Sequence, residues 1–276
     1  MPPTAEGLRH ASVPAPAPSL AISLKEWAQH PLTLRILSIV IAVAAWEYAG
    51  RLPVSPSFPT FSDTFLAFVG MLADGSLPAA FAVTLAPLAI GVAISALIGV
   101  AIGVAMGLNE KVEWLGVPVF IVLQAAPLAA LIPVLVLAYG IGVTTKVSVV
   151  CIMAMPVIVL NSFKAVRHTP HSLLDMGRSF MGSRRQLIGK IILPSATPVI
   201  FAGLRLGTAA GFVGAVLAEL LVTPTGIGDI ITYNQSIAEY PKMYAAIAAV
   251  IIVSVLFIEL LGFVEQRFLR PEKRGS

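Results

Sequence analysis

The stretch Leu173–Pro194, LLDMGRSFMGSRRQLIGKIILP, is the segment that best defines this chain. It is polar and basic, and it separates two apolar runs that are each long enough to cross a lipid bilayer. Its charged residues are Asp175, Arg178, Arg184, Arg185 and Lys190. Because both flanking runs are apolar, we expect this loop to be where the protein meets a partner in the aqueous phase.

The composition predicts a membrane protein. Hydrophobic residues make up 57% of the 276 residues, charged residues only 12%, and the mean hydropathy is +0.91. A soluble domain carries about a quarter charged residues. The apolar runs are continuous rather than alternating, which excludes an outer-membrane barrel and predicts helices that satisfy their own backbone polar groups.

A membrane-spanning helix needs about 20 apolar residues. Such runs lie at 32–50, 82–108, 115–139, 147–163, 196–222 and 243–265. The predicted fold class is therefore an all-α membrane protein with six transmembrane helices, in one transmembrane domain over residues 31–272. Residues 1–30 include the tract VPAPAPS and are expected to form a disordered cytoplasmic tail. A cleaved signal peptide is the alternative for the first run.

The basic residues sort by side of the membrane. Most of the 18 lysines and arginines lie before the first run, in the Leu173–Pro194 loop, or after the last run. Arg51, Lys146 and Lys242 are assigned to loops on the opposite side. The excess of basic residues in cytoplasmic loops then predicts that both termini and the basic loop, between helices four and five, face the cytoplasm of a multi-pass protein.

Residues 53–78 contain several prolines and are not expected to span the membrane. Within them Phe61, Phe65, Phe68 and Leu72 recur at helical spacing, which predicts a short amphipathic helix. We expect this apolar stripe to pack on the helix bundle rather than to bind a ligand. Small residues at Gly91, Gly99, Gly103 and Gly107 likewise predict close helix packing.

The basic loop resembles the EAA loop of ABC importer permeases. Its end, Ile191-x-Leu193-Pro194, matches the Ile-x-Leu-Pro that closes the family motif. That match places Asp175, Met176 and Gly177 at the family's Glu-Ala-Ala. The family glycine then falls on Met181, so Gly182, one residue later, is the candidate for its conformational role.

The flanks of the loop resemble the same family. The segments that carry the likeness are Gly203-Leu204-Arg205, Ala218-Glu219 and Thr225-Gly226-Ile227-Gly228. They are similar to the binding-protein-dependent type I importers of the nitrate, taurine and alkyl-sulfonate group, over an importer-like core of about residues 78–266. The resemblance implies an inner-membrane permease, with a homodimer of this chain, two copies of a separate P-loop ATPase and an extracytoplasmic solute-binding protein.

The loop is expected to couple the permease to that ATPase. Two short helices are predicted within it, at 171–180 and 183–190, the second ending before Pro194. The proposed ATPase-coupling residues are Asp175, Met176, Gly177, Arg178, Phe180, Gly182, Arg184 and Arg185. The sequence contains no G-x-x-x-x-G-K-[ST], H-E-x-x-H or nucleophile-elbow motif. We therefore expect no catalytic residue, cofactor or metal in this chain, and no nucleic-acid partner.

Three polar residues within spans are candidates for the solute pathway or for interfaces. Charged groups inside a membrane are costly and face the bundle interior. Arg205 is expected near the cytoplasmic end of its helix and Glu219 near the outer end. Gln124 falls where several anion-importing relatives carry an arginine, and a neutral amide offers no charge compensation. Both a nitrate-, sulfonate- or taurine-like anion and a pyrimidine-like organic solute stay open.

The predicted function is the permease subunit of an ATP-driven ABC importer that works by alternating access. An ATP-independent secondary carrier is the alternative from another class. Such carriers show internal repeats and interrupted helices, and no convincing repeat is visible in this sequence. A membrane-embedded assembly subunit is a third possibility.

Overall fold

A computed structural model describes residues 31–52, 55, 57–222 and 225–269 of the chain. The tail predicted at residues 1–30 lies outside this part. The chain divides into two compact units, residues 1–54 and 55–276. In the first unit, helix α2 (Pro31–Arg51) matches the first predicted span. Its last turn carries an ion pair in which Arg51 Nη2 lies 2.7 Å from Glu47 Oε1.

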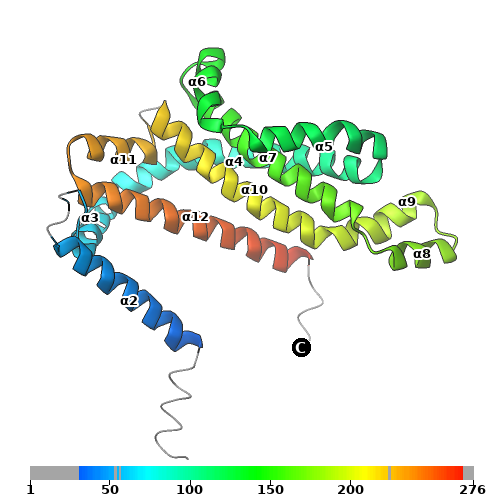
Figure 1. The fold of residues 1–276 in the computed structure, drawn as a ribbon, viewed down its shortest axis with the longest axis horizontal. Helices are drawn as coiled ribbons and strands as arrows, with labels where there is room; N and C mark the ends of the chain where they lie inside the picture. The colour runs from blue at the N-terminus through cyan, green and yellow to red at the C-terminus, as the bar shows by residue number, and fades with distance from the viewer. Residues whose placement is uncertain (1–30, 53–54, 56, 223–224, 270–276) are drawn as a thin grey trace, which may run out of the picture. The chain divides into compact units, whose positions relative to one another are not determined.

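In the second unit the described residues form helices connected by short turns (Figure 1). They are α3 (Phe61–Ala73), α4 (Ser76–Leu108), α5 (Glu110–Ala125), α6 (Leu128–Tyr139), α7 (Val143–Arg167), α8 (His171–Ser179), α9 (Arg184–Leu187), the π-helical segment η1 (Ile188–Ile192), α10 (Leu193–Leu221), α11 (Ile227–Ser236) and α12 (Tyr240–Leu269). Helices α4, α7, α10 and α12 correspond to the second, fourth, fifth and sixth predicted spans.

The third predicted span, 115–139, is wrong as a continuous helix. Five described helices are long and apolar enough to cross a membrane, and the pair α5 and α6 makes a sixth if it counts as one bent span. The two meet at an angle of 104°. Ala126, at the break, is extended with ψ 135°, as expected for a residue before proline, and Pro127 then starts the new helix.

The amphipathic helix predicted within 53–78 is present as α3, but its predicted stripe is only partly correct. Thr64 and Met71 are its buried residues, with Phe68 packed beside them, whereas Phe65 and Leu72 are about half exposed. The helix is rotated because Met71 belongs to the main core cluster, which fixes the face that turns inward.

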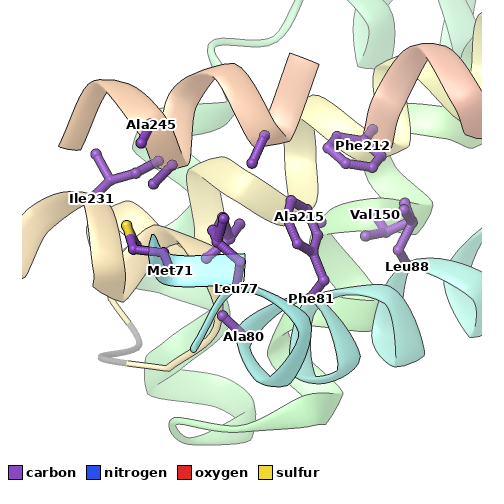
Figure 2. Close-up of a cluster of buried hydrophobic side chains, with 13 residues drawn as sticks. Met71, Leu77, Ala80, Phe81, Leu88, Val150, Phe212, Ala215, Ile231 and Ala245 are labelled. Carbon is purple, nitrogen blue, oxygen red and sulfur yellow. The ribbon is translucent and has the colours of Figure 1, made fainter. Parts of the chain in front are cut away.

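The main core lies where α3, α4, α7, α10, α11 and α12 meet (Figure 2). The residues that fill it include Met71, Leu88, Val150, Phe212, Ile231 and Ala245, one from each helix. Away from this cluster many large apolar side chains stay exposed, for example Leu97, Leu137 and Leu206. Such a surface is suited to lipid or to partner chains, because contiguous apolar patches of this kind are rare on soluble monomers.

Helix α7 packs against glycines of α4, as the sequence predicts. A Cβ added at Gly91 would lie 2.6 Å from Val150 Cγ1, and one at Gly107 would lie 2.6 Å from Val166 Cβ. Gly99 and Gly103 of α4 face α7 in the same way. The prediction of close packing is confirmed.

Helix α10 presents a second row of glycines to α7, which was not predicted from the sequence. They are Gly203, Gly207, Gly211 and Gly214. A Cβ at Gly214, for example, would lie 2.8 Å from Met153 Cγ. Helix α7 is therefore in close contact with two neighbours through residues that have no side chain.

Candidate functional site

The loop that joins α7 to α10 consists of α8 and α9 at one end of the second unit (Figure 1). Helix α8 ends in a Schellman motif, in which the Gly182 amide donates to the Gly177 carbonyl at 3.1 Å and the Met181 amide donates to the Arg178 carbonyl at 2.8 Å. This motif satisfies carbonyl groups that would otherwise be unpaired at the end of α8 and turns the chain into α9.

The residue in the left-handed conformation at this turn is Met181, with φ +52°. The expectation that Gly182 takes this role is wrong, because Gly182 is not among the glycines with positive φ. Glycine is the usual residue at this position of a Schellman motif, and a residue with a Cβ is strained there by roughly 1–2 kcal/mol. Gly182 is needed for a different reason: an added Cβ would lie 2.8 Å from the Gly177 carbonyl oxygen.

The segment Asp175-Met176-Gly177 divides between two faces of α8. Gly177 is buried against α9 and η1, where an added Cβ would meet the side chains of Leu187 and Ile191. Met176 is half exposed, Phe180 is 82% exposed and Met181 is 94% exposed. The loop thus presents large apolar side chains to its surroundings while its glycine holds the two helices together.

Charged residues surround these apolar side chains. Arg178 Nη1 lies 3.3 Å from Asp175 Oδ1, and both side chains are 68% exposed. Arg184 and Arg185 lie exposed at the start of α9. The start of α9 is fixed by a capping box, in which the Ser183 amide donates to Gln186 Oε1 at 2.8 Å and the Gln186 amide donates to Ser183 Oγ.

The prediction that the second loop helix ends before Pro194 is wrong. Arg184–Leu221 is one apolar helical stretch of 38 residues that includes α9, η1 and α10. The Leu193 amide donates to the Ile188 carbonyl, a bond of the wider π-helical type. This wider turn accommodates Pro194, which lacks an amide hydrogen and would clash with the preceding turn of a regular helix.

A basic cavity lies where the loop approaches the ends of α4 and α7. Its volume is about 350 Å³, and its lining includes Arg167, His171, Arg178 and Arg184. Arg167 Nε also lies 3.4 Å from Glu113 Oε2, which joins the end of α7 to the first turn of α5. The end of α7 that leads into the loop is therefore connected to the start of α5.

A buried polar cluster lies at the opposite end of α10. Glu219 and Lys146 are an ion pair with Nζ and Oε1 2.6 Å apart, and the Glu219 and Lys146 side chains are 0% and 4% exposed. Thr84 Oγ1 lies 2.8 and 3.0 Å from the two carboxylate oxygens of Glu219, so its hydroxyl donates to the carboxylate. The Gly228 amide donates to Glu219 Oε2 at 3.1 Å. The carboxylate is thus paired and hydrogen-bonded through both oxygens, as burial of a charge requires.

The predicted position of Lys146 in an outer loop is wrong. The charge pattern places it with the loop cations, but it lies in the first turn of α7 and is buried. A signal was present, since Lys146 is the only charged residue between Leu115 and Phe163 and a buried Glu219 needs a cation. Thr84 could not have been identified in this way, because nothing distinguishes it from other hydroxyl residues within apolar runs.

The three pathway candidates lie in different surroundings. Glu219 is in the buried cluster just described, and Arg205 is partly buried where α10 meets Gly262 of α12. Gln124 lies exposed near the end of α5, close to the bend before α6. Arg205 and Glu219 are 14 positions apart on α10, or about 21 Å at 1.5 Å per residue. They do not form one site.

Comparisons with known proteins agree with this arrangement. The riboflavin transport system permease protein of Chloroflexus aurantiacus is 32% identical over 247 residues, which are 88% of this chain and 89% of that protein. The taurine transport system permease protein of Escherichia coli is 26% identical over 249 residues, 87% of this chain and 90% of that protein.

A similar fold occurs in a chain of the methionine ABC transporter MetNI, solved in an inward-facing conformation. The TM-score is 0.54 at 20% identity, and the match covers 68% of this chain and 91% of that one. Residues 95–270 match the family described as the inner membrane component of binding-protein-dependent transport systems. The match includes the basic loop, the spans on either side of it and Glu219. This chain belongs to the family of binding-protein-dependent transport system inner membrane components.

Proposed function

We propose that this chain is the permease subunit of an ATP-driven importer in which the α8–α9 loop receives the movement of a separate ATPase subunit. Membership of the family supports ATP-driven import as the general activity. The sequence contains no phosphate-binding P-loop motif, so ATP is bound and hydrolysed by the partner. The chain is a transporter component rather than an enzyme.

The observation that carries the proposal is the exposure of Phe180 and Met181 on a short, internally braced loop between two spans. Protein interfaces commonly place apolar or aromatic anchors at the centre and charged groups at the rim. Phe180, Met181 and Met176 supply such a centre. The rim residues are Asp175, Arg178, Arg184 and Arg185. Gly177 and Gly182 act indirectly, by holding α8 against α9 and shaping the turn.

The distribution of basic residues sets the proposed orientation. Both termini and the α8–α9 loop face the cytoplasm, and the buried cluster around Glu219 and the start of α11 lie towards the outer side of the inner membrane. Two copies of this chain with two ATPase subunits and an extracytoplasmic solute-binding protein complete the importer. A two-fold homodimer is the simplest arrangement, because one gene product supplies both halves.

The proposed solute is a small neutral heteroaromatic molecule rather than a strongly anionic one. Gln124, on the exposed face of α5, offers an amide in place of a compensating cation. A relative that is 32% identical is a riboflavin permease. Uptake into native vesicles of labelled riboflavin, cytosine, taurine and nitrate distinguishes the classes. Preferential uptake of taurine or nitrate would reject the proposal of a neutral heteroaromatic solute, and the proposal that the chain is an importer permease would still stand.

The first test of the proposal is to purify the tagged chain from its native membrane in mild detergent. A P-loop ATPase that co-purifies in stoichiometric amount, with ATP hydrolysis in the preparation, is the expected result. A chain that comes alone, and whose uptake is driven by an ion gradient without ATP, would favour the secondary carrier instead.

A further inference from the structure

We propose that Lys146 and Glu219 are positioning residues for transport, which fasten the turn before α11 to the far ends of the two helices that carry the α8–α9 loop. This inference rests on the function proposed above. The two ends of α10 are about 40 Å apart, since the helix has 29 residues at 1.5 Å each. A movement received at the loop therefore needs a rigid connection to reach α11.

The buried cluster joins four separate elements. Glu219 comes from α10, Lys146 from α7 and Thr84 from α4, and the turn before α11 together with the first residues of α11 supplies the remaining groups. Lys146 Nζ donates to Thr225 Oγ1 at 3.0 Å as well as to Glu219. The Ile227 amide donates to Thr84 Oγ1 at 3.0 Å. The turn is thus held by bonds to all three long helices.

The turn also passes directly against the carboxylate. Gly226 has φ +81°, and a Cβ there would meet Glu219 Oε1 and lie 2.6 Å from Thr84 Oγ1. At Gly228 a Cβ would meet the Cβ of Glu219 and lie 3.0 Å from the Leu220 amide nitrogen. Two glycines therefore allow the turn to lie in contact with the ion pair. Helix continuity does not connect the parts, because α10 ends at Leu221 and α11 begins at Ile227.

The helices that the cluster joins are themselves closely packed. A Cβ added at Gly207 of α10 would lie 2.8 Å from Ile158 Cδ1 of α7, and a Cβ added at Gly214 would contact the Met153 side chain. Such close contact leaves little room for α7 and α10 to slide past each other. Both helices end in the α8–α9 loop on one side and in the Lys146–Glu219 pair on the other. The pair therefore makes α11 move with the helices that the loop displaces.

A buried ion pair is a poor way to gain stability, because apolar residues of the same volume stabilise a protein as well or better. Its use here fits a positional role, since its geometry fixes three helices and a turn at one point. This distinction suggests a variant that removes the charges together. The double substitution Lys146→Met with Glu219→Gln leaves no unpaired buried charge. It removes both hydrogen bonds from α7 to the cluster, and the new side-chain amide at position 219 keeps an oxygen for Thr84 and the Gly228 amide.

The test measures how α11 responds to nucleotide in the complete complex with its ATPase, reconstituted in lipid nanodiscs so that ATP and the labelling reagent reach both faces. Cys151→Ala removes the only native cysteine, and Tyr233→Cys, on the exposed face of α11, then reports through its rate of reaction with a membrane-impermeant maleimide. A second reporter, Ser179→Cys at the exposed end of α8, shows whether the ATPase covers the loop. ATP with vanadate traps the complex, so no transported solute is needed.

The parent carries the reporter substitutions and the native Lys146–Glu219 pair. In this parent we expect trapping with ATP and vanadate to change the labelling rate at Tyr233→Cys by about fivefold or more, a typical size for coupling between sites. In the double variant that change is lost, although the ATPase still protects Ser179→Cys. An undiminished response in the double variant overturns the inference, as does a parent that protects Ser179→Cys yet shows no change at Tyr233→Cys. Failure of the ATPase to protect Ser179→Cys in the parent overturns the proposed function as well.

A second variant covers the case in which the double substitution does not assemble. Thr225 is exposed, and Thr225→Val removes only the acceptor of one Lys146 hydrogen bond. We expect a partial loss of the nucleotide response at Tyr233→Cys, with Thr225→Ser as the matched control that keeps the hydroxyl. Equal responses in Thr225→Val and Thr225→Ser contradict the inference.

Discussion

Gly177 of α8 lies so close to Leu187 of α9 that a Cβ added at the glycine would be 2.5 Å from Leu187 Cδ2. The backbone of α8 at Gly177 is therefore in direct contact with the Leu187 side chain of α9. This contact sets the angle at which Phe180 and Met181 are presented, and it gives the loop a defined shape without a hydrophobic core of its own.

Substitutions at Gly177 should separate loop shape from loop chemistry. Gly177→Ala meets only the ends of two flexible side chains, which can shift, and alanine favours a helix by about 1 kcal/mol over glycine. We expect it to keep ATPase binding. Gly177→Leu should push α9 away and weaken binding of the ATPase by tenfold or more, roughly 1.4 kcal/mol. The affinity of each purified variant for the ATPase, measured in detergent, checks both expectations. Equal affinities of the Gly177→Ala and Gly177→Leu variants would contradict the packing role.

The left-handed residue at Met181 allows a test of strain. Met181→Gly should stabilise the turn by about 1 kcal/mol, because glycine adopts φ +52° without a steric penalty. Met181→Ala keeps the strain and removes the same side chain, so it is the matched control. Hydrogen exchange of the Gly182 amide, which closes the Schellman motif, should slow in Met181→Gly relative to Met181→Ala. No difference between the two variants would mean that the turn is not strained.

Charge reversal in the loop should affect the partner more than the fold. The Asp175–Arg178 pair is exposed, and pairs of this kind contribute about 0–1 kcal/mol. We expect Asp175→Arg or Arg178→Glu to leave thermal unfolding almost unchanged while ATP-dependent uptake in vesicles falls at least severalfold. The double reversal restores the pair within the chain but not the contact with the ATPase, so it should stay defective. Normal uptake in both single variants would show that these charges do not dock the ATPase.

The buried ion pair should show strong non-additivity in stability. Removing one partner leaves a buried charge unpaired, which is expected to destabilise the protein by about 3–5 kcal/mol. Lys146→Met and Glu219→Gln should each lower the midpoint of thermal unfolding in detergent. The double variant should recover most of the loss. Losses that simply add would indicate that the two residues do not interact in the folded protein.

Two glycines of α4 should respond differently to the same substitution. A Cβ at Gly103 would lie 2.5 Å from the Val159 carbonyl oxygen of α7, a backbone atom, so Gly103→Ala must force the helices apart. A Cβ at Gly99 would lie 3.1 Å from Ile158 Cγ2, which can give way. We expect a loss of about 1–3 kcal/mol for Gly103→Ala. The loss for Gly99→Ala should be clearly smaller, and the thermal unfolding midpoints of the two variants provide the comparison.

The positions of the spanning helices could be predicted because each depends on a local property, a long apolar run. The bend between α5 and α6 could not. Pro87 and Pro156 lie inside α4 and α7, which run on as single helices, whereas the chain breaks at Pro127. Which proline ends a helix depends on the surroundings that can accommodate it. The same limit applied at Pro194, where a π-helical turn lets the helix continue.

Residues at the ends of the spans were harder to place than the spans themselves. Lys146 lies at the edge of an apolar run, where a cation is usually in contact with water, and its partner Glu219 is 73 positions away. The loop residues were easier, since the exposure of Phe180 and the Asp175–Arg178 pair follow from spacing along one short helix. Met181 shows the opposite case, because the motif favours glycine and only the backbone geometry reveals which residue is left-handed.

The π-helical segment makes the two ends of the α8–α9 loop mechanically unequal. On one side, α7 stops at Arg167 and α8 starts at His171, so a short non-helical joint lies between them. On the other side, Arg184–Leu221 has no such joint. A rotation of α9 is therefore transmitted to α10 through a continuous helix. The non-helical residues before α8 can absorb part of such a rotation before it reaches α7. Under the proposed function, a movement of the loop is expected to reach α10 more directly than α7.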